Sequence, residues 1–164
     1  MSKVDAFIKI GSLKGESLDD KHQDWIDVLS WNWGMTNAGS GHMGGGSGTG
    51  KGDVQDFHFT KTVDTSSTYL AQRLMKGEHF DTATFELRKA SGESTPLVYY
   101  KVEFEKVFIS SMTFGGSGSG GAFTESITFN FKSFKATYQK QADSGGSAGQ
   151  SSLGWDVSKH IEIG

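Results

Sequence analysis

The stretch 44–53 is where the chain comes nearest to a known chemical motif. It reads GGGSGTGKGD, and Gly45, Gly50 and Lys51 match the spacing of the phosphate-binding loop G-x-x-x-x-G-K-[ST]. Such a loop binds phosphate because its glycines connect a strand to the N-terminus of a helix. Here Gly52 stands where the magnesium-binding hydroxyl is needed, and the residues that follow predict a strand. The stretch therefore predicts a loop and not a nucleotide site.

Histidines and carboxylates are the other side chains that could do chemistry. The aspartate–histidine pairs at 56–58 and 79–81 each offer two metal ligands, with no third ligand adjacent in sequence. A glycosidase needs two carboxylates facing each other across a cleft. Glu103 and Glu105 instead alternate with apolar residues, which predicts the solvated face of one strand. We expect no metal site, no cofactor and no catalytic residues.

Glycine-rich stretches divide the chain. Glycine is in excess, at 23 of 164 residues against one proline, and cysteine is absent. The glycines gather at 39–52, 115–121 and 144–154, between segments rich in β-branched and aromatic residues. Glycine confined in this way predicts long loops on a β scaffold. The chain length predicts a single domain, residues 1–164.

Apolar and polar residues alternate with a period of two through most of the segments between these loops. Two examples are 24–34 and 53–63. Such alternation is typical of strands with one buried face. In 24–34 it places three of the four tryptophans and Leu29 on one face, with Ser30 and Asn32 on the opposite face. We expect the tryptophan face to pack into the core.

The segment 64–77 departs from this alternation. Its leucines recur at a spacing of four, Asp64 or a nearby hydroxyl can cap the first turn, and Gly77 suits the C-terminal end. This predicts one short helix at about residues 66–76. The predicted fold is therefore all-β: a β-barrel or sandwich of two sheets with one flanking helix.

Charge and hydropathy exclude several classes of function. The formal net charge is −3 with scattered lysines, whereas nucleic-acid-binding proteins concentrate Lys and Arg on one face. The N-terminus has no apolar segment and cleavage site of a secretory signal, and no apolar run approaches a membrane span. We expect a soluble protein made in the cytoplasm, with no nucleic-acid partner and no membrane insertion.

A carbohydrate-binding function is the alternative that the residues leave open. Exposed indoles can stack on sugar rings, so a monomeric β-sandwich module that binds carbohydrate has to be considered. Three tryptophans share the predicted core face, which weighs against it. Trp155 follows a glycine-rich stretch, and we expect it to anchor the returning chain.

Four stretches, in order, resemble the haemolysin-coregulated protein (Hcp) family, whose members form the tube of bacterial type VI secretion systems. They are FIKIGSLKGES followed by KH and IDVLSWNWG; FTKTVDTSSTYLAQRLMKGEHF; VFISSMTFGG leading into ESITFNFKSFKATY; and GWDVSKH. The second is similar to the family's strand–helix unit. In the third, Glu125 stands at the family's usual glutamate. The match covers essentially the whole chain.

The resemblance implies a hexameric ring of β-barrel subunits with no catalytic residues. Rings of this kind stack into a hollow tube inside a contractile sheath and behind a spike protein, and contraction drives the tube out of the cell. The ring lumen implies a second role as carrier and chaperone of small effector proteins. The chain ends just past the closing motif, so we expect no C-terminal toxin extension.

Two sets of residues are candidates for these roles. Small polar side chains suit a lumen that accepts varied cargo, which favours Ser30, Asn32 and, in the second glycine-rich stretch, Ser117. The first glycine-rich loop can lie flat against a neighbouring ring and become ordered at an entropic cost. We expect it to contact the next ring through Gly39, Ser40, His42, Met43, Gly50 and Lys51.

Overall fold

The computed structural model describes residues 4–39, 51–89, 97–121, 123–141 and 147–164. Its elements are, in chain order, β1 (Val4–Ile10), β2 (Ile26–Asp27), β3 (Ser30–Asn32), β4 (Met35–Asn37), β5 (Gly52–Val54), β6 (Phe57–Thr62), α1 (Ser67–Lys76), β7 (Phe80–Lys89), β8 (Val98–Gly115), β9 (Thr124–Asn130), β10 (Ser133–Gln141), β11 (Ser147–Asp156) and β12 (Ile161–Glu162). The predicted helix is confirmed to within one residue. It ends at Gly77, whose φ of 68° is the left-handed conformation that favours glycine.

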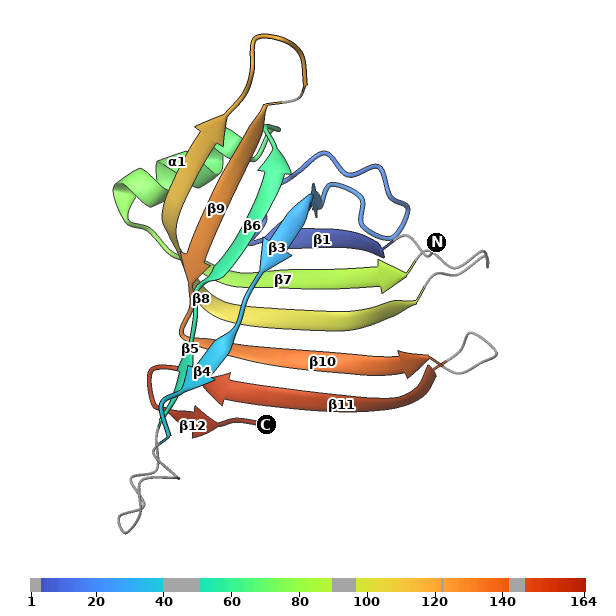
Figure 1. Ribbon diagram of the computed structural model, residues 1–164, viewed down its shortest axis with the longest axis vertical. Helices are drawn as coiled ribbons and strands as arrows, with labels where there is room; N and C mark the ends of the chain where they lie inside the picture. The colour runs from blue at the N-terminus through green and yellow to red at the C-terminus, as the bar shows by residue number, and fades with distance from the viewer. Residues whose placement is uncertain (1–3, 40–50, 90–96, 122, 142–146) are drawn as a thin grey trace.

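Two layers share one long strand (Figure 1). The larger sheet has the order β12-β11-β10-β8-β7-β1-β2, and a smaller layer is built from β3, β6, β9 and the second half of β8. Strand β8 pairs with β7 as far as Val107 and with β9 from Phe108 onward. Lys106, with a φ of 53°, lies at this change of partner. The long strand therefore passes from one layer to the other at this point.

Phenylalanine rings fill the space between the layers. Phe57 is fully buried, and its ring centroid lies 5.0 Å from that of Phe85 and 5.3 Å from that of Phe104. Removing such a side chain from water stabilises the fold by about 1.5–3 kcal/mol. Leu70 adds the buried face of helix α1 to this core. The apolar residues that alternate with polar ones in the strands thus form the core between the two layers.

The predicted all-β fold of two sheets with one short helix is confirmed, as a sandwich and not as a closed barrel. Among the described residues β3 pairs only with β6, and β12 pairs only with β11. Both layers therefore keep open edges. Within the same residues, no helix is long and apolar enough to cross a membrane.

The loop predicted at 144–154 is wrong for most of its length. Strand β11 begins at Ser147 and pairs with β10 through to Asp156. Glycine and serine are poor strand formers, but a neighbouring strand that supplies hydrogen bonds overrides this preference. Gly154 also allows a close approach, because a Cβ atom there would lie 2.2 Å from the Ile163 carbonyl oxygen. The other two stretches lie between strands, apart from their ends in β5 and β8.

The single strand predicted over 24–34 is instead divided between the two layers. Strand β2 pairs with β1 in the larger sheet, whereas β3 pairs with β6 in the smaller layer. The crossing interrupts the alternation, so Leu29 is 58% exposed and does not join the core. The segment 53–63 is likewise divided into β5 and β6, and β5 forms a separate hairpin with β4.

Candidate assembly surfaces

The outer face of the small layer carries small polar side chains. Ser30 and Asn32 are exposed on β3 and lie opposite Thr60 and His58 of β6. The hydroxyls of Ser30 and Thr60 are 2.5 Å apart, and His58 Nδ1 lies 2.9 Å from Thr128 Oγ1 on β9. Ser30 and Asn32 thus share an exposed face, as the alternation predicts. Sequence reasoning missed their neighbours, because only strand pairing brings those residues together.

Ser117 is not part of this face. It lies in the connection between β8 and β9, where its Oγ is 2.8 Å from Ser119 Oγ. That connection projects beyond the upper end of the small layer in Figure 1. The three lumen candidates therefore do not form one surface, and their contact with cargo stays a prediction.

The predicted contact segment 39–52 connects β4 to β5 in the sequence, and these two strands pair as a hairpin. In this hairpin Met35 pairs with Val54 and Asn37 with Gly52. Of the predicted contact residues, Gly39 and Lys51 are exposed next to this hairpin, and Ser40, His42, Met43 and Gly50 lie outside the described residues. Lys51 precedes a strand and not a helix, which agrees with the rejection of a phosphate-binding loop.

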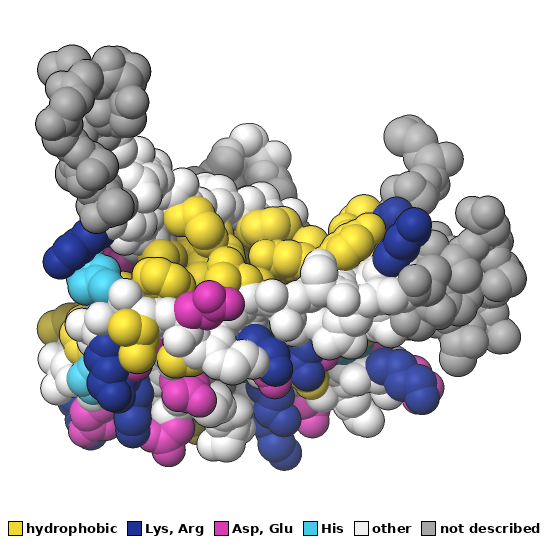
Figure 2. Space-filling view, turned by 90° about the horizontal axis from the view of Figure 1, so that it is seen from below, with side chains coloured by type: hydrophobic (Ala, Val, Ile, Leu, Met, Phe, Trp, Pro, Cys, Tyr) yellow, Lys and Arg dark blue, Asp and Glu magenta, His cyan; other side chains and the backbone are white. Residues whose placement is uncertain are grey.

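An apolar groove lies between this hairpin and strands β10 and β11. It has a volume of about 360 Å³, and its apolar lining comes from Met35, Val54, Phe134, Leu153 and Trp155. Met35 is 50% exposed and Leu153 is 38% exposed. Figure 2 shows hydrophobic side chains gathered on this end of the molecule. Sequence reasoning missed the groove, because a loop at 144–154 would remove the wall that β11 provides.

Two of the tryptophans pack against the core. The ring of Trp33 meets those of Phe104 and Phe134 nearly edge-on, at centroid distances of 5.7 and 4.9 Å. Trp31 lies parallel to Phe57 at 6.2 Å. A ring face that is packed in this way is not free to stack on a sugar. This weakens the carbohydrate-binding alternative for Trp33, whereas Trp31 stays 38% exposed and Trp155 lines the apolar groove.

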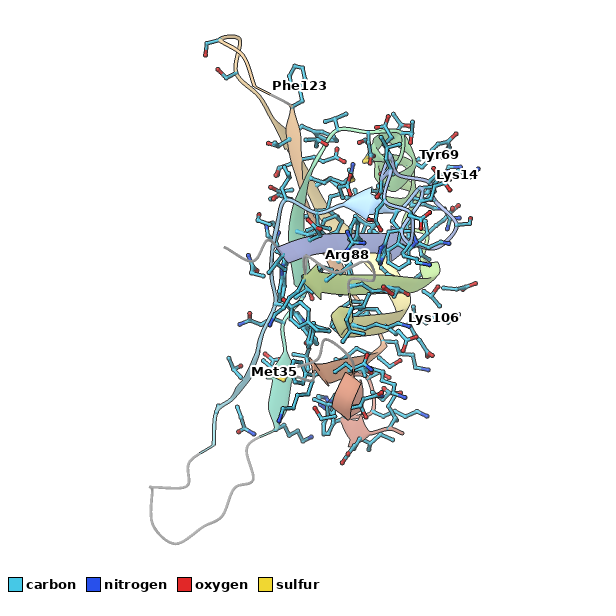
Figure 3. The ribbon with its side chains drawn as sticks, turned by 90° about the vertical axis from the view of Figure 1, so that its right-hand side faces the viewer. Lys14, Met35, Tyr69, Arg88, Lys106 and Phe123 are labelled. Carbon is cyan, nitrogen blue, oxygen red and sulfur yellow. The ribbon has the colours of Figure 1, made fainter. Side chains whose placement is uncertain are left out.

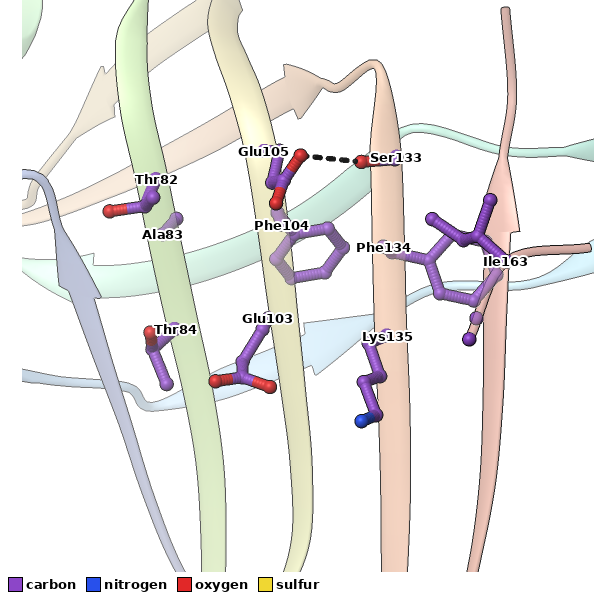
Figure 4. Close-up of a pocket in the computed structure, with 12 residues that line it drawn as sticks. Thr82, Ala83, Thr84, Glu103, Phe104, Glu105, Ser133, Phe134, Lys135 and Ile163 are labelled. Atoms are coloured by element: carbon purple, nitrogen blue, oxygen red, sulfur yellow. Dashed lines mark hydrogen bonds between the residues drawn. The ribbon is translucent and has the colours of Figure 1, made fainter. Parts of the chain in front are cut away.

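The two glutamates of β8 lie on the solvated face of the larger sheet. They border an open depression of about 390 Å³, which Figure 4 shows. Glu105 accepts a hydrogen bond of 3.2 Å from Ser133 Oγ, and Glu103 lies opposite Lys135 of β10. Both carboxylates come from one strand and do not face each other across a cleft. In the part of the chain that the structure describes, no group of three potential metal ligands occurs.

A buried ion pair joins helix α1 to the small layer. Lys61 of β6 is fully buried, and its ammonium contacts the carboxylate of Glu125 on β9, which is also buried. The ammonium also donates to Asp64 Oδ1 at 2.8 Å and to Ser67 Oγ at 3.0 Å. Ser67 is the first residue of α1 and donates to Glu125 Oε1 at 2.8 Å. We call this group the lysine cluster, and it links the start of α1 to β6 and β9.

A second charged group, the histidine cluster, holds the segment between β1 and β2 against β7. His22 is 2% exposed, with Nδ1 at 2.8 Å from Asp19 Oδ2 and Nε2 at 3.0 Å from Glu86 Oε2. Its ring stacks on Phe7 at a centroid distance of 4.1 Å. Each nitrogen faces a carboxylate, and both can donate only when the imidazole is protonated. The geometry therefore favours the cationic ring.

The surrounding charges favour the same state. Burial by itself lowers the pKa of His22, but the hydrogen bonds to Glu86 and Asp19 outweigh it and raise this pKa. Burial raises the pKa of Asp19, and the contacts with His22 and Arg88 reverse that effect and lower it. Arg88 also binds Asp5, at 3.1 Å, so the cluster reaches β1. Sequence reasoning missed the cluster because Glu86 is 64 residues from His22.

This chain is similar to known proteins in both sequence and fold. A family model described as "Type VI secretion system effector, Hcp" matches residues 7–138. Protein hcp1 of Pseudomonas aeruginosa is 43% identical over 160 residues, which are 97% of this chain and 98% of that protein. A solved type six secretion system protein superposes with a TM-score of 0.90 at 30% identity, over 98% of this chain and 100% of its own. Hcp1 from Salmonella typhimurium has a TM-score of 0.79 at 28% identity, with the same coverage.

Proposed function

The chain belongs to the Hcp family of type VI secretion proteins, and from this premise we propose that it works as a ring-forming subunit of the secretion tube. Six copies of this single-domain subunit form a ring, and the rings stack into a hollow tube. The contractile sheath surrounds the tube, a spike protein covers its tip, and contraction drives it out of the cell. The subunit has a structural role, with no catalytic step and no cofactor.

The apolar groove is the observation that carries this proposal. Met35 and Leu153 leave apolar surface in water there. Covering it removes about 25 cal/mol of unfavourable hydration per square ångström, and this gain opposes the entropy cost of association. Contiguous exposed apolar surface with a polar rim is typical of protein–protein contacts. A second copy of the same chain can cover this apolar surface. Self-assembly is therefore the function that this surface supports best.

The hydroxyl-rich face of the small layer is our candidate for the lumen wall. Ser30 and Asn32 present small hydrogen-bonding groups, which suit weak contact with varied effector proteins. Asn32→Arg places a bulky charge on this face without touching the apolar groove. We expect weaker co-purification of an effector with a ring of unchanged mass. Unchanged capture of the effector would contradict the assignment of Asn32 to the lumen wall.

Contacts between stacked rings are assigned to the segment 39–52. Within this segment the described residues Gly39 and Lys51 are exposed, which supports a contact with a neighbouring ring. Shortening it to a two-residue turn between β4 and β5 should keep single rings and abolish stacking. Stacks of the shortened protein in negative-stain images would contradict this assignment.

The first test is the mass of the protein in solution. Light scattering on a size-exclusion column gives the mass, and negative-stain images of the same peak give the particle shape. A mass of six chains with ring-shaped particles is the expected result. A monomer at high concentration would overturn the proposal, and binding to a glycan array would then be measured next.

A further inference from the structure

A second apolar patch lies at the end of the molecule opposite the apolar groove. Val63, Phe114 and Phe123 are 46%, 60% and 70% exposed at the ends of β6, β8 and β9. The backbone N–H of Val63 donates to the Phe123 carbonyl oxygen at 3.1 Å, so the first and last of them are adjacent. We call these three residues the phenylalanine knob. Figure 3 shows Phe123 near one end of the long axis and Met35, in the groove, toward the other.

The three side chains of the knob face the same way. Phe114 pairs with Glu125, which also pairs with Lys61, so all three point to one face of the small layer. Val63 and Phe123 lie two residues from Lys61 and Glu125 along their strands, and side chains two apart share a face. Helix α1 covers that face at Glu125. The knob therefore continues the inner face of the layer beyond the part that the helix covers.

One segment at each end of the molecule lacks charged residues, which suits the centre of an interface, although Asp53 of β5 also lines the groove. Residues 112–124, which carry two of the knob residues, include no Asp, Glu, Lys or Arg. Residues 147–155, which form one wall of the groove, include none either. Depletion of charged residues is the compositional mark of an interface core, and aromatic residues are enriched there.

The exposed area is large enough to matter. A phenylalanine side chain has about 150–250 Å² to bury, so the two exposed rings of the knob offer roughly 250 Å². A standard interface buries about 800 Å² on each partner. The knob would then supply about a third of the area that one partner buries. The polar loop residues around the knob would form the rim of the interface.

We propose that the phenylalanine knob of one copy sits in the apolar groove of the next copy, and that this contact closes the ring. The inference rests on the proposed function. Knob and groove are different surfaces on opposite ends, so the contact is heterologous. Repeated heterologous contacts form a closed ring when the rotation between copies returns the last copy to the first. Contacts within a permanent ring are more apolar than transient ones, which favours the ring over the stack for these surfaces.

Two charge substitutions test the pairing. Phe123→Asp removes the knob, and Leu153→Asp places a charge in the groove; both positions are exposed, so the fold is kept. Each variant alone is expected to fall from six chains to one in light scattering. Tyr69→Asp is the matched control, because Tyr69 is 57% exposed in the first turn of α1 and lies apart from both Phe123 and Met35 in Figure 3. It should retain the hexamer.

Mixing the two variants decides whether the contact is heterologous. The Leu153→Asp variant keeps an intact knob, and the Phe123→Asp variant keeps an intact groove. An equimolar mixture should therefore give a heterodimer that contains one chain of each variant. Rings of Phe123→Asp and Phe114→Asp, each with the circular dichroism of the wild type, would overturn the inference and leave the proposed function intact. Self-association of Leu153→Asp alone would also overturn it. A monomeric wild type would overturn the proposed function itself.

Discussion

The lysine cluster and the histidine cluster hold different parts of the molecule in place. The first uses the ammonium of Lys61, and the second uses the imidazole of His22. Lys61 and Glu125 are both buried and join helix α1 to the small layer. His22 is equally buried, but the side chains of its partners Asp19 and Glu86 are 20% and 14% exposed, and they hold a long connection on the larger sheet. Imidazole is the side chain whose ordinary pKa lies nearest to neutral pH. The attachment made by the histidine cluster therefore depends on the protonation of His22.

Burial explains why the two clusters should differ in strength. A charge that loses its partner inside the protein stays desolvated, whereas a charge near the surface is partly rehydrated by water. The lysine cluster should therefore show the larger loss when a partner is removed. Four substitutions or conditions test this order, from the largest expected effect to the smallest.

Glu125→Ala should cause the largest loss of stability. It leaves the Lys61 ammonium buried without its main counter-charge, which costs about 3–5 kcal/mol of unfolding free energy. Chemical unfolding in urea measures the loss. The double variant Lys61→Met with Glu125→Leu removes both buried charges of the pair and should recover part of the stability. A loss below about 1 kcal/mol for Glu125→Ala would mean that the helix is held mainly by packing.

His22→Phe should cost less. The phenyl ring can still stack on Phe7, but Asp19 and Glu86 lose their donor, at an expected cost of about 1–3 kcal/mol. His79→Phe is the matched control, because His79 is exposed and makes a ring contact with Phe108. The control should change the free energy by less than about 0.5 kcal/mol. Equal losses in the two variants would contradict a special role for His22.

Stability should depend on pH through the same histidine. The pKa of His22 is raised in the folded protein, so its contribution is complete below the ordinary value of 6.5. It should be lost as the pH rises through the higher folded value. Thermal unfolding from pH 6 to pH 9 measures the decline, which His22→Phe should flatten while Glu125→Ala leaves its slope unchanged. A wild-type midpoint that does not fall over this range would show that His22 is neutral in the folded state.

Arg88→Lys should have the smallest effect of the four. Arg88 binds Asp19 at 2.7 Å and Asp5 at 3.1 Å, and a lysine lacks the planar fork that reaches both carboxylates at once. Because both aspartates are partly exposed, we expect a loss of about 0.5–1 kcal/mol. The loss should shrink in high salt if it is electrostatic. A salt-independent loss would point to packing of the guanidinium on Phe7 instead.

The limits of sequence reasoning can be seen in particular segments. Helix α1 was predictable because its leucine spacing and Gly77 are local signals. Strand β11 was not, because its glycines and serines carry no strand preference and only pairing with β10 stabilises them. The candidate site divides in the same way: alternation placed Ser30 and Asn32 on one face, but it could not place the groove.

The sequence by itself determined the strand-rich composition, helix α1, the strand that follows Lys51 and the order of motifs that resembles the Hcp family. These are properties of short windows, where spacing and residue type suffice. Only the tertiary structure decided that His22 meets Glu86, that Lys61 meets Glu125, and that Met35 and Leu153 line one groove. Each of these contacts joins residues tens of positions apart. They follow from strand order and register, which the cooperative packing of the whole chain determines.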